Sequence, residues 1–117
     1  MTICLDRIIG EQLSSVEFVQ DYVQLRFDGP TITAFVWPTI NLSGNIIRFG
    51  DAGYRDALCA RIARKVTAAR IIEVVCLTVQ FDDYAELKIS LKPEDSVGPE
   101  AGYFCVDSNS RSPLLEF

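Results

Sequence analysis

Two stretches of the chain alternate strictly between apolar and polar side chains, which is the pattern of a strand with one buried face. The first is Val23–Gly29 and the second is Leu77–Asp83, and each ends on acidic residues that favour a turn. Downstream, Thr31–Trp37 and Glu86–Lys92 keep a shared alternation, and each is followed by a proline. These matched segments predict two related β-rich units.

A regular spacing of apolar residues precedes each unit and extends the match. The residues recur every four positions: Leu5, Ile9 and Leu13, and then Leu58, Ile62 and Val66. We therefore expect an internal repeat of residues 5–38 and 58–93, followed by a C-terminal tail over 98–117 that holds a further strand. The same spacing predicts one main helix over Tyr54–Lys65. The repeat favours a strand over Val66–Ile72, and a continuation of the helix through Thr67–Ala69 is an alternative that propensity does not decide.

The fold class predicted from these elements is α+β, mainly antiparallel, with two duplicated β-meander units packed with one main helix. Short connections favour antiparallel pairing of neighbouring strands. A chain of 117 residues fits a single domain over residues 1–117. A sandwich, a roll and a partly closed barrel all agree with the pattern.

The charge and the apolar content narrow the choice of partners and compartment. The chain carries 16 acidic and 11 basic residues, a net charge of −5, and residues 76–117 hold eight acidic and three basic ones. Such a chain is repelled by nucleic acid and by anionic membranes, so we expect neither as a partner. No apolar stretch is long enough to cross a bilayer, and no secretory signal is visible. The expected location is the cytoplasm.

The residue types also limit the chemistry. Histidine is absent, so this chain alone cannot form a Ser/His or Cys/His nucleophilic site. The four cysteines, Cys4, Cys59, Cys76 and Cys105, form no C-x-x-C pair and are expected to be reduced thiols in apolar surroundings. We expect no metal site and no cofactor.

One face of the first unit is unusually aromatic. If Ile32, Ala34 and Val36 face the core, then Phe35 and Trp37 face the other way, with Tyr22 nearby. The matching face of the second unit is polar, and it consists of Glu86, Lys88, Ser90 and Lys92. The simpler interpretation is that the main helix covers the aromatic face. The alternative is a ligand groove or a protein interface, with Tyr22, Phe35 and Trp37 as the binding residues.

A cluster of carboxylates is the other candidate site. Asp82, Asp83 and Glu86 lie within five positions, so they could hold a divalent cation or perform acid–base chemistry. An exposed hairpin turn normally carries the same residue types, and this interpretation is the simpler one.

Three short segments give a family resemblance. Ile9–Leu13, Phe27–Gly29 and Gly98–Ala101 are similar to segments of small, uncharacterised bacterial proteins with two β-rich halves, some of which resemble immunity proteins. The resemblance implies a binding role and transfers no catalytic residue. We therefore expect a non-enzymatic protein that binds another protein, or itself, through the aromatic face. The alternatives are a small-molecule carrier with an aromatic-lined pocket and a carboxylate-dependent hydrolase.

Overall fold

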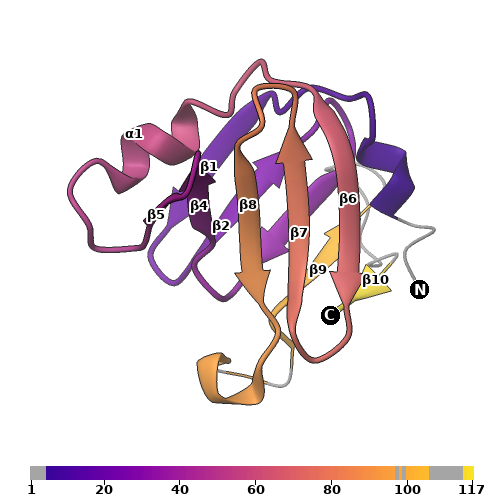
Figure 1. Ribbon diagram of the computed structural model, residues 1–117. Helices are drawn as coiled ribbons and strands as arrows, with labels where there is room; N and C mark the ends of the chain where they lie inside the picture. The colour runs from indigo at the N-terminus through magenta and orange to yellow at the C-terminus, as the bar shows by residue number, and fades with distance from the viewer. Residues whose placement is uncertain (1–4, 97, 99, 106–114) are drawn as a thin grey trace.

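Two five-stranded sheets form the framework of the computed structural model, which describes residues 5–96, 98, 100–105 and 115–117 (Figure 1). Sheet 1 has the strand order β1-β2-β3-β9-β10, and sheet 2 has the order β5-β4-β8-β7-β6. The strands are β1 Ser15–Val19, β2 Tyr22–Arg26, β3 Thr31–Ala34, β4 Thr39–Leu42, β5 Asn45–Ile47, β6 Val66–Ile72, β7 Cys76–Phe81, β8 Glu86–Ser90, β9 Gly102–Cys105 and β10 Leu115–Glu116. The helical elements are η1 Leu5–Ile8, α1 Tyr54–Cys59 and η2 Pro93–Asp95.

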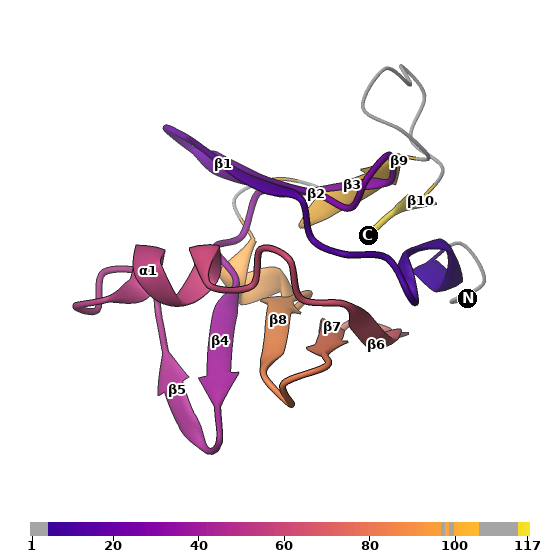
Figure 2. The same cartoon turned by 90° about the horizontal axis from the view of Figure 1, so that it is seen from above.

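The sheets lie face to face as two layers, so the structure is a sandwich (Figure 2). One helical element lies at each open edge: α1 next to β4 and β1, and η1 next to β6. The core between the layers contains fully buried side chains from both sheets, among them Leu25, Ile32 and Phe104 of sheet 1 and Val79 and Leu87 of sheet 2. The mainly antiparallel arrangement predicted from the sequence is confirmed, and one short α-helix accompanies the sheets.

The predicted alternation is present in the central strands. In β2, Val23 and Leu25 are fully buried, whereas the alternating residues Tyr22, Gln24 and Arg26 are half-buried. Strands β1–β2–β3 and β6–β7–β8 form antiparallel meanders with the same register. Leu25 pairs with Val16 and Ile32, and Val79 pairs in the same way with Ala69 and Leu87.

Each meander is completed by strands from the other half of the chain. After β3, the chain crosses to sheet 2, where β4 pairs with β8. After β8, it crosses back to sheet 1, where β9 pairs with β3. Every pairing between these named strands is antiparallel, and β4 and β9 each pair with a further strand, β5 and β10. The two crossovers were not predicted, because the alternation shows which face of a strand is buried but not which strand lies beside it.

The main helix is shorter than predicted. It spans Tyr54–Cys59 and not Tyr54–Lys65, and β6 begins at Val66, so the continuation through Thr67–Ala69 is wrong as well. Residues 62–66 pair instead with residues 10–13, through the bridges Gln12–Lys65 and Leu13–Ile62. Ala63 has a φ of +75°, which a helix does not allow. Among the described residues, no helix is long and apolar enough to span a membrane.

Candidate functional site: a groove at the crossover between the sheets

An open groove of about 710 Å³ lies where the chain crosses from sheet 1 to sheet 2. We call it the crossover groove. Its lining comes from the β1–β2 turn, the crossover and the end of β8 with η2: Gln20, Asp21, Phe35, Val36, Trp37, Thr39, Ser90 and Asp95. A smaller hollow of about 290 Å³ shares Trp37, Thr39, Ser90 and Asp95 and continues past Lys88 and Lys92. The linings of the two hollows together contain both aromatic and charged side chains.

Phe35 is held by ring contacts and by the backbone. Its N–H donates a 2.7 Å hydrogen bond to the carbonyl of Ala101, which continues the β3–β9 pairing beyond the end of β3. Its ring contacts Tyr22 and Tyr103 edge to face, with 5.8 Å between the ring centres in each case. Phe35 therefore has little freedom to change rotamer.

Trp37 is held by a separate set of rings. It stacks on Phe49 with 4.4 Å between ring centres and an angle of 13°, and it lies 6.4 Å from Phe18. Phe49 in turn contacts Tyr54 of α1 edge to face at 5.7 Å. The tryptophan is thus fixed between the crossover and the helix.

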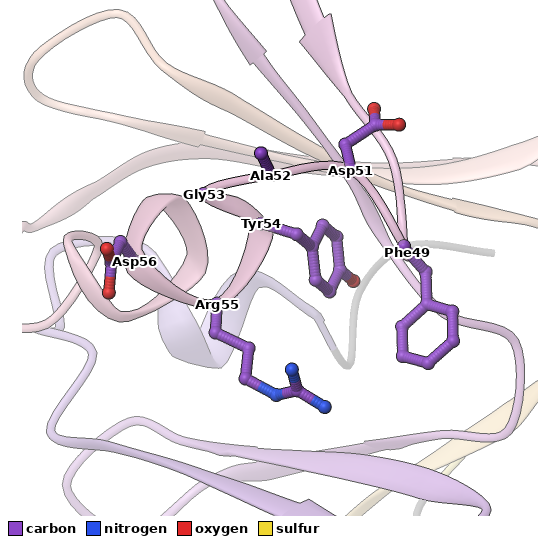
Figure 3. A pocket seen from close by; sticks show the side chains of 8 residues that line it. Phe49, Asp51, Ala52, Gly53, Tyr54, Arg55 and Asp56 are labelled. Carbon is purple, nitrogen blue, oxygen red and sulfur yellow. The ribbon is translucent and has the colours of Figure 1, made fainter.

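The loop before α1 supports this second aromatic group and encloses a hollow of about 390 Å³. Figure 3 shows the rings of Phe49 and Tyr54 and the guanidinium of Arg55 on one side of the loop, whereas Asp51 points to the other. The Tyr54 hydroxyl donates a 2.5 Å hydrogen bond to the carbonyl of Pro38, so α1 is fastened directly to the crossover. Burial raises the pKa of Tyr54 above its ordinary value. This loop positions Trp37 and offers few side chains of its own to a ligand.

The structure brings the predicted binding residues together in part. Phe35 and Trp37 line one groove, and Tyr22 supports Phe35; all three are half-buried. The expectation that the helix covers the aromatic face is wrong. α1 lies at the edge of the sandwich and reaches Trp37 through Phe49 and Phe18. The contributions of Ser90 and Asp95 were missed, since they come from the other half of the chain across an unpredicted crossover.

The carboxylate cluster has a different environment. Both Oδ atoms of Asp83 accept hydrogen bonds of 2.7 Å from Nη1 of Arg61. The Arg61 side chain is only 6% exposed, and its guanidinium lies 5.7 Å from the ring centre of Phe81. Burial acts to raise the pKa of Asp83, but the hydrogen bonds from Arg61 and from the N–H of Ala85, with the charges of Arg61 and Arg64, outweigh it and lower the pKa.

The other two carboxylates of the cluster have partners of their own. Asp82 lies 3.7 Å from Nη1 of Arg64, and Glu86 lies 4.0 Å from Nζ of Lys88. Within the described ranges, no group of three or more potential ligands could hold a metal ion. The contacts of Asp82 and Asp83 thus join the β7–β8 turn to the connection between α1 and β6.

Comparisons of the chain with protein-family models, with curated proteins and with solved structures found no match. The functional argument therefore depends on the geometry of this chain.

Proposed function

We propose that this protein binds another protein in the crossover groove and does not act as an enzyme. The observation that supports the proposal is the pair Phe35 and Trp37, each held in place by other aromatic rings at the lining of an open groove. Aromatic side chains that are already ordered lose little entropy on binding, and such residues dominate the energetics of interfaces.

The charges around the groove suit an interface. Asp21, Asp95, Lys88 and Lys92 line the two hollows together with the aromatic side chains, and protein interfaces combine apolar and polar residues in the same way. Asp95 accepts a 2.6 Å hydrogen bond from the Ser90 hydroxyl, which orders η2 at the rim. The net charge of −5 would speed the encounter with a basic partner. An immunity-like role, in which a partner protein is held and neutralised, would use such a groove.

A small-molecule carrier is the second candidate. The volume of about 710 Å³ lies within the usual range for ligand sites, roughly 300–1,000 Å³. The groove is open, so a small ligand would stay partly in water, whereas a protein segment would cover the whole lining. This difference favours the protein partner.

Substitution of a groove residue tests the proposal. Phe35→Ala removes one ring and leaves the stacked Trp37 in place, and Tyr84→Ala, at a highly exposed turn residue, is the matched control. In extracts of the source organism, a partner should be retained by the wild type and by Tyr84→Ala. Its affinity for purified Phe35→Ala should be lower by about 2 kcal/mol, or roughly thirtyfold. Equal binding by the two variants would contradict the proposal, and a small molecule seen by native mass spectrometry would favour the carrier.

We also infer that the two meanders descend from one duplicated unit. This inference is supported by the backbone hydrogen bonds between residues 10–13 and 63–66, which form reciprocal pairs. Gly10 donates to Val66 while Ala63 donates to Leu13, and Leu13 donates to Arg64 while Val66 donates to Glu11. In each pair, one hydrogen bond becomes the other when its donor and its acceptor are shifted by 53 residues in opposite directions along the chain. A two-fold axis through this site would produce the same relation. If the inference holds, a fragment spanning residues 51–117 should form a β-rich dimer, whereas an unstructured monomer in sedimentation would count against it.

We propose a cytoplasmic location as well. Cys59 and Cys76 are free thiols, which suits a reducing compartment. Cys4 lies outside the described residues. Fractionation of the source cells tests the location directly.

A further inference from the structure

A second hollow, of about 430 Å³, is lined by residues of the β6–β7 hairpin, of the chain that leaves β8 and of the C-terminal end with β10. We call it the hairpin pocket. Its described lining is mostly apolar and includes two carboxylates: Ile71, Glu73, Val74, Leu91, Pro93, Glu116 and Phe117. It occupies the place in the second half of the chain that the crossover groove occupies in the first, because Glu73, Val74 and Leu91 correspond to Gln20, Asp21 and Val36 of the predicted repeat.

Val74, at the tip of the hairpin, is the most unusual residue of this pocket. Its side chain is 65% exposed, and its φ is +63°, a left-handed conformation that β-branched residues rarely adopt. Glycine or asparagine would be more stable at this position, and a polar residue would be better hydrated. Both the exposure and the backbone strain therefore act against stability, as expected for a residue retained for binding. Ile72 and Val75 beside it are also exposed.

The charged residues of the pocket's described lining have one sign. Glu73 and Glu116 are the charged residues of its described lining, and the Glu116 carboxyl is hydrogen-bonded to that of Glu100. This hydrogen bond, with the negative charge of Glu100 and some burial, raises the pKa of Glu116. No arginine or lysine among the described residues pairs with any of the three carboxylates. Asp82 and Asp83, in contrast, lie beside Arg64 and Arg61.

We propose that the hairpin pocket binds a segment of a partner protein in which an apolar side chain is flanked by lysine or arginine. The apolar side chain would lie against Ile71, Leu91 and Phe117, and the flanking cations would lie beside Glu73 and Glu116. Charge complementarity selects this occupant over a second copy of the chain. In a symmetric dimer the same carboxylates would face each other and repel. The pocket is separate from the crossover groove, so the proposal stands independently of the function proposed above.

Titration of the full chain with two short peptides tests the proposal. The probes are acetyl-Lys-Phe-Lys-amide and acetyl-Glu-Phe-Glu-amide, added to ¹⁵N-labelled protein at low salt while amide shifts are recorded. The basic peptide should shift the amides of Ile71, Val74, Leu91 and Phe117, and the acidic peptide should not. The double variant Glu73→Gln/Glu116→Gln should weaken binding about fivefold, as expected for two exposed ion pairs. The control Asp6→Asn/Asp56→Asn changes the net charge equally at exposed residues elsewhere and should bind normally.

Val74→Gly separates a binding role from a structural one. Glycine relieves the left-handed strain, so the variant should unfold at a temperature a few degrees higher than the wild type while it binds the basic peptide several-fold more weakly. A variant that binds normally would overturn the proposal. Four other results would also overturn the proposal. They are equal shifts with both peptides, no shifts, shifts confined to the crossover groove, and concentration-dependent dimer contacts at Val74 in the absence of peptide.

Discussion

The bond between Arg61 and Asp83 makes Asp83→Asn the most informative single substitution for stability. Arg61 is nearly buried, and both Oδ atoms of Asp83 lie 2.7 Å from its Nη1. Removing one partner of a fully buried ion pair costs about 3–5 kcal/mol. The Asp83 side chain is 25% exposed and Arg64 lies 3.6 Å away, so water and a second cation moderate the cost. We expect a loss of about 2 kcal/mol in the free energy of unfolding.

Thermal unfolding followed by circular dichroism measures this loss. The entropy of unfolding of a chain this size is about 0.25 kcal/mol/K, so 1 kcal/mol corresponds to about 4 °C. Asp83→Asn should therefore lower Tm by about 8 °C. Asp82→Asn is the matched control, because its side chain is 41% exposed and 3.7 Å from Arg64. The control should lower Tm by about 2 °C or less, as expected for a surface pair.

The pH dependence gives an independent check. Because the folded protein lowers the pKa of Asp83 from 3.8, the stabilisation is fully present above that value and is lost as the pH falls through the lower pKa of the folded state. The wild type and Asp83→Asn should therefore converge in stability as the pH falls below about 4. Equal Tm values for Asp83→Asn and Asp82→Asn near neutral pH, or a difference that persists in acid, would refute the reasoning.

Two further substitutions test the sandwich. A Cβ at Gly102 would lie 2.2 Å from the carbonyl oxygen of Thr33 and 2.7 Å from the ring of Phe117. Gly102→Ala should therefore lower the free energy of unfolding, measured with urea, by about 3 kcal/mol. An unchanged unfolding midpoint would show that β3 and β9 are not so close. Tyr54→Phe removes the hydrogen bond to Pro38 and should cost about 1.5 kcal/mol. Because the folded state raises the pKa of Tyr54, wild-type stability should fall as the pH rises above about 10, and this loss should be absent from Tyr54→Phe.

The sequence predicted the strands better than their arrangement. Alternation of apolar and polar residues identified β2, β3, β7 and β8, and in β2 and β8 the apolar residues are buried while the others are more exposed. In β3 and β7 the polar residues Thr33 and Thr78 are buried as well. The helix was overextended because Leu58, Ile62 and Val66 satisfy helical spacing, whereas Val66 begins β6 and residues 62–66 pair with residues 10–13. A periodicity in one segment carries no information about pairing with a segment some fifty residues away.

The candidate sites were predictable only as far as they are local. Phe35 and Trp37 differ from their counterparts in the second unit, and the structure places both in one groove. Phe49 was missed because it lies in a loop without periodicity, yet it makes the closest ring contact of Trp37. Arg61 falls within the predicted helix Tyr54–Lys65, and only the fold brings it within 2.7 Å of Asp83, 22 positions away.

The two hollows show how similar backbones can carry different chemistry. Each lies between a first hairpin turn and the chain that leaves a third strand. At corresponding positions of the predicted repeat, the first has Gln20 and Asp21 where the second has Glu73 and Val74. Residues that pack the core match in character between the halves, because both must fill the same interior. The residues at the hollows are free of that constraint, and their divergence agrees with the two different occupants proposed above.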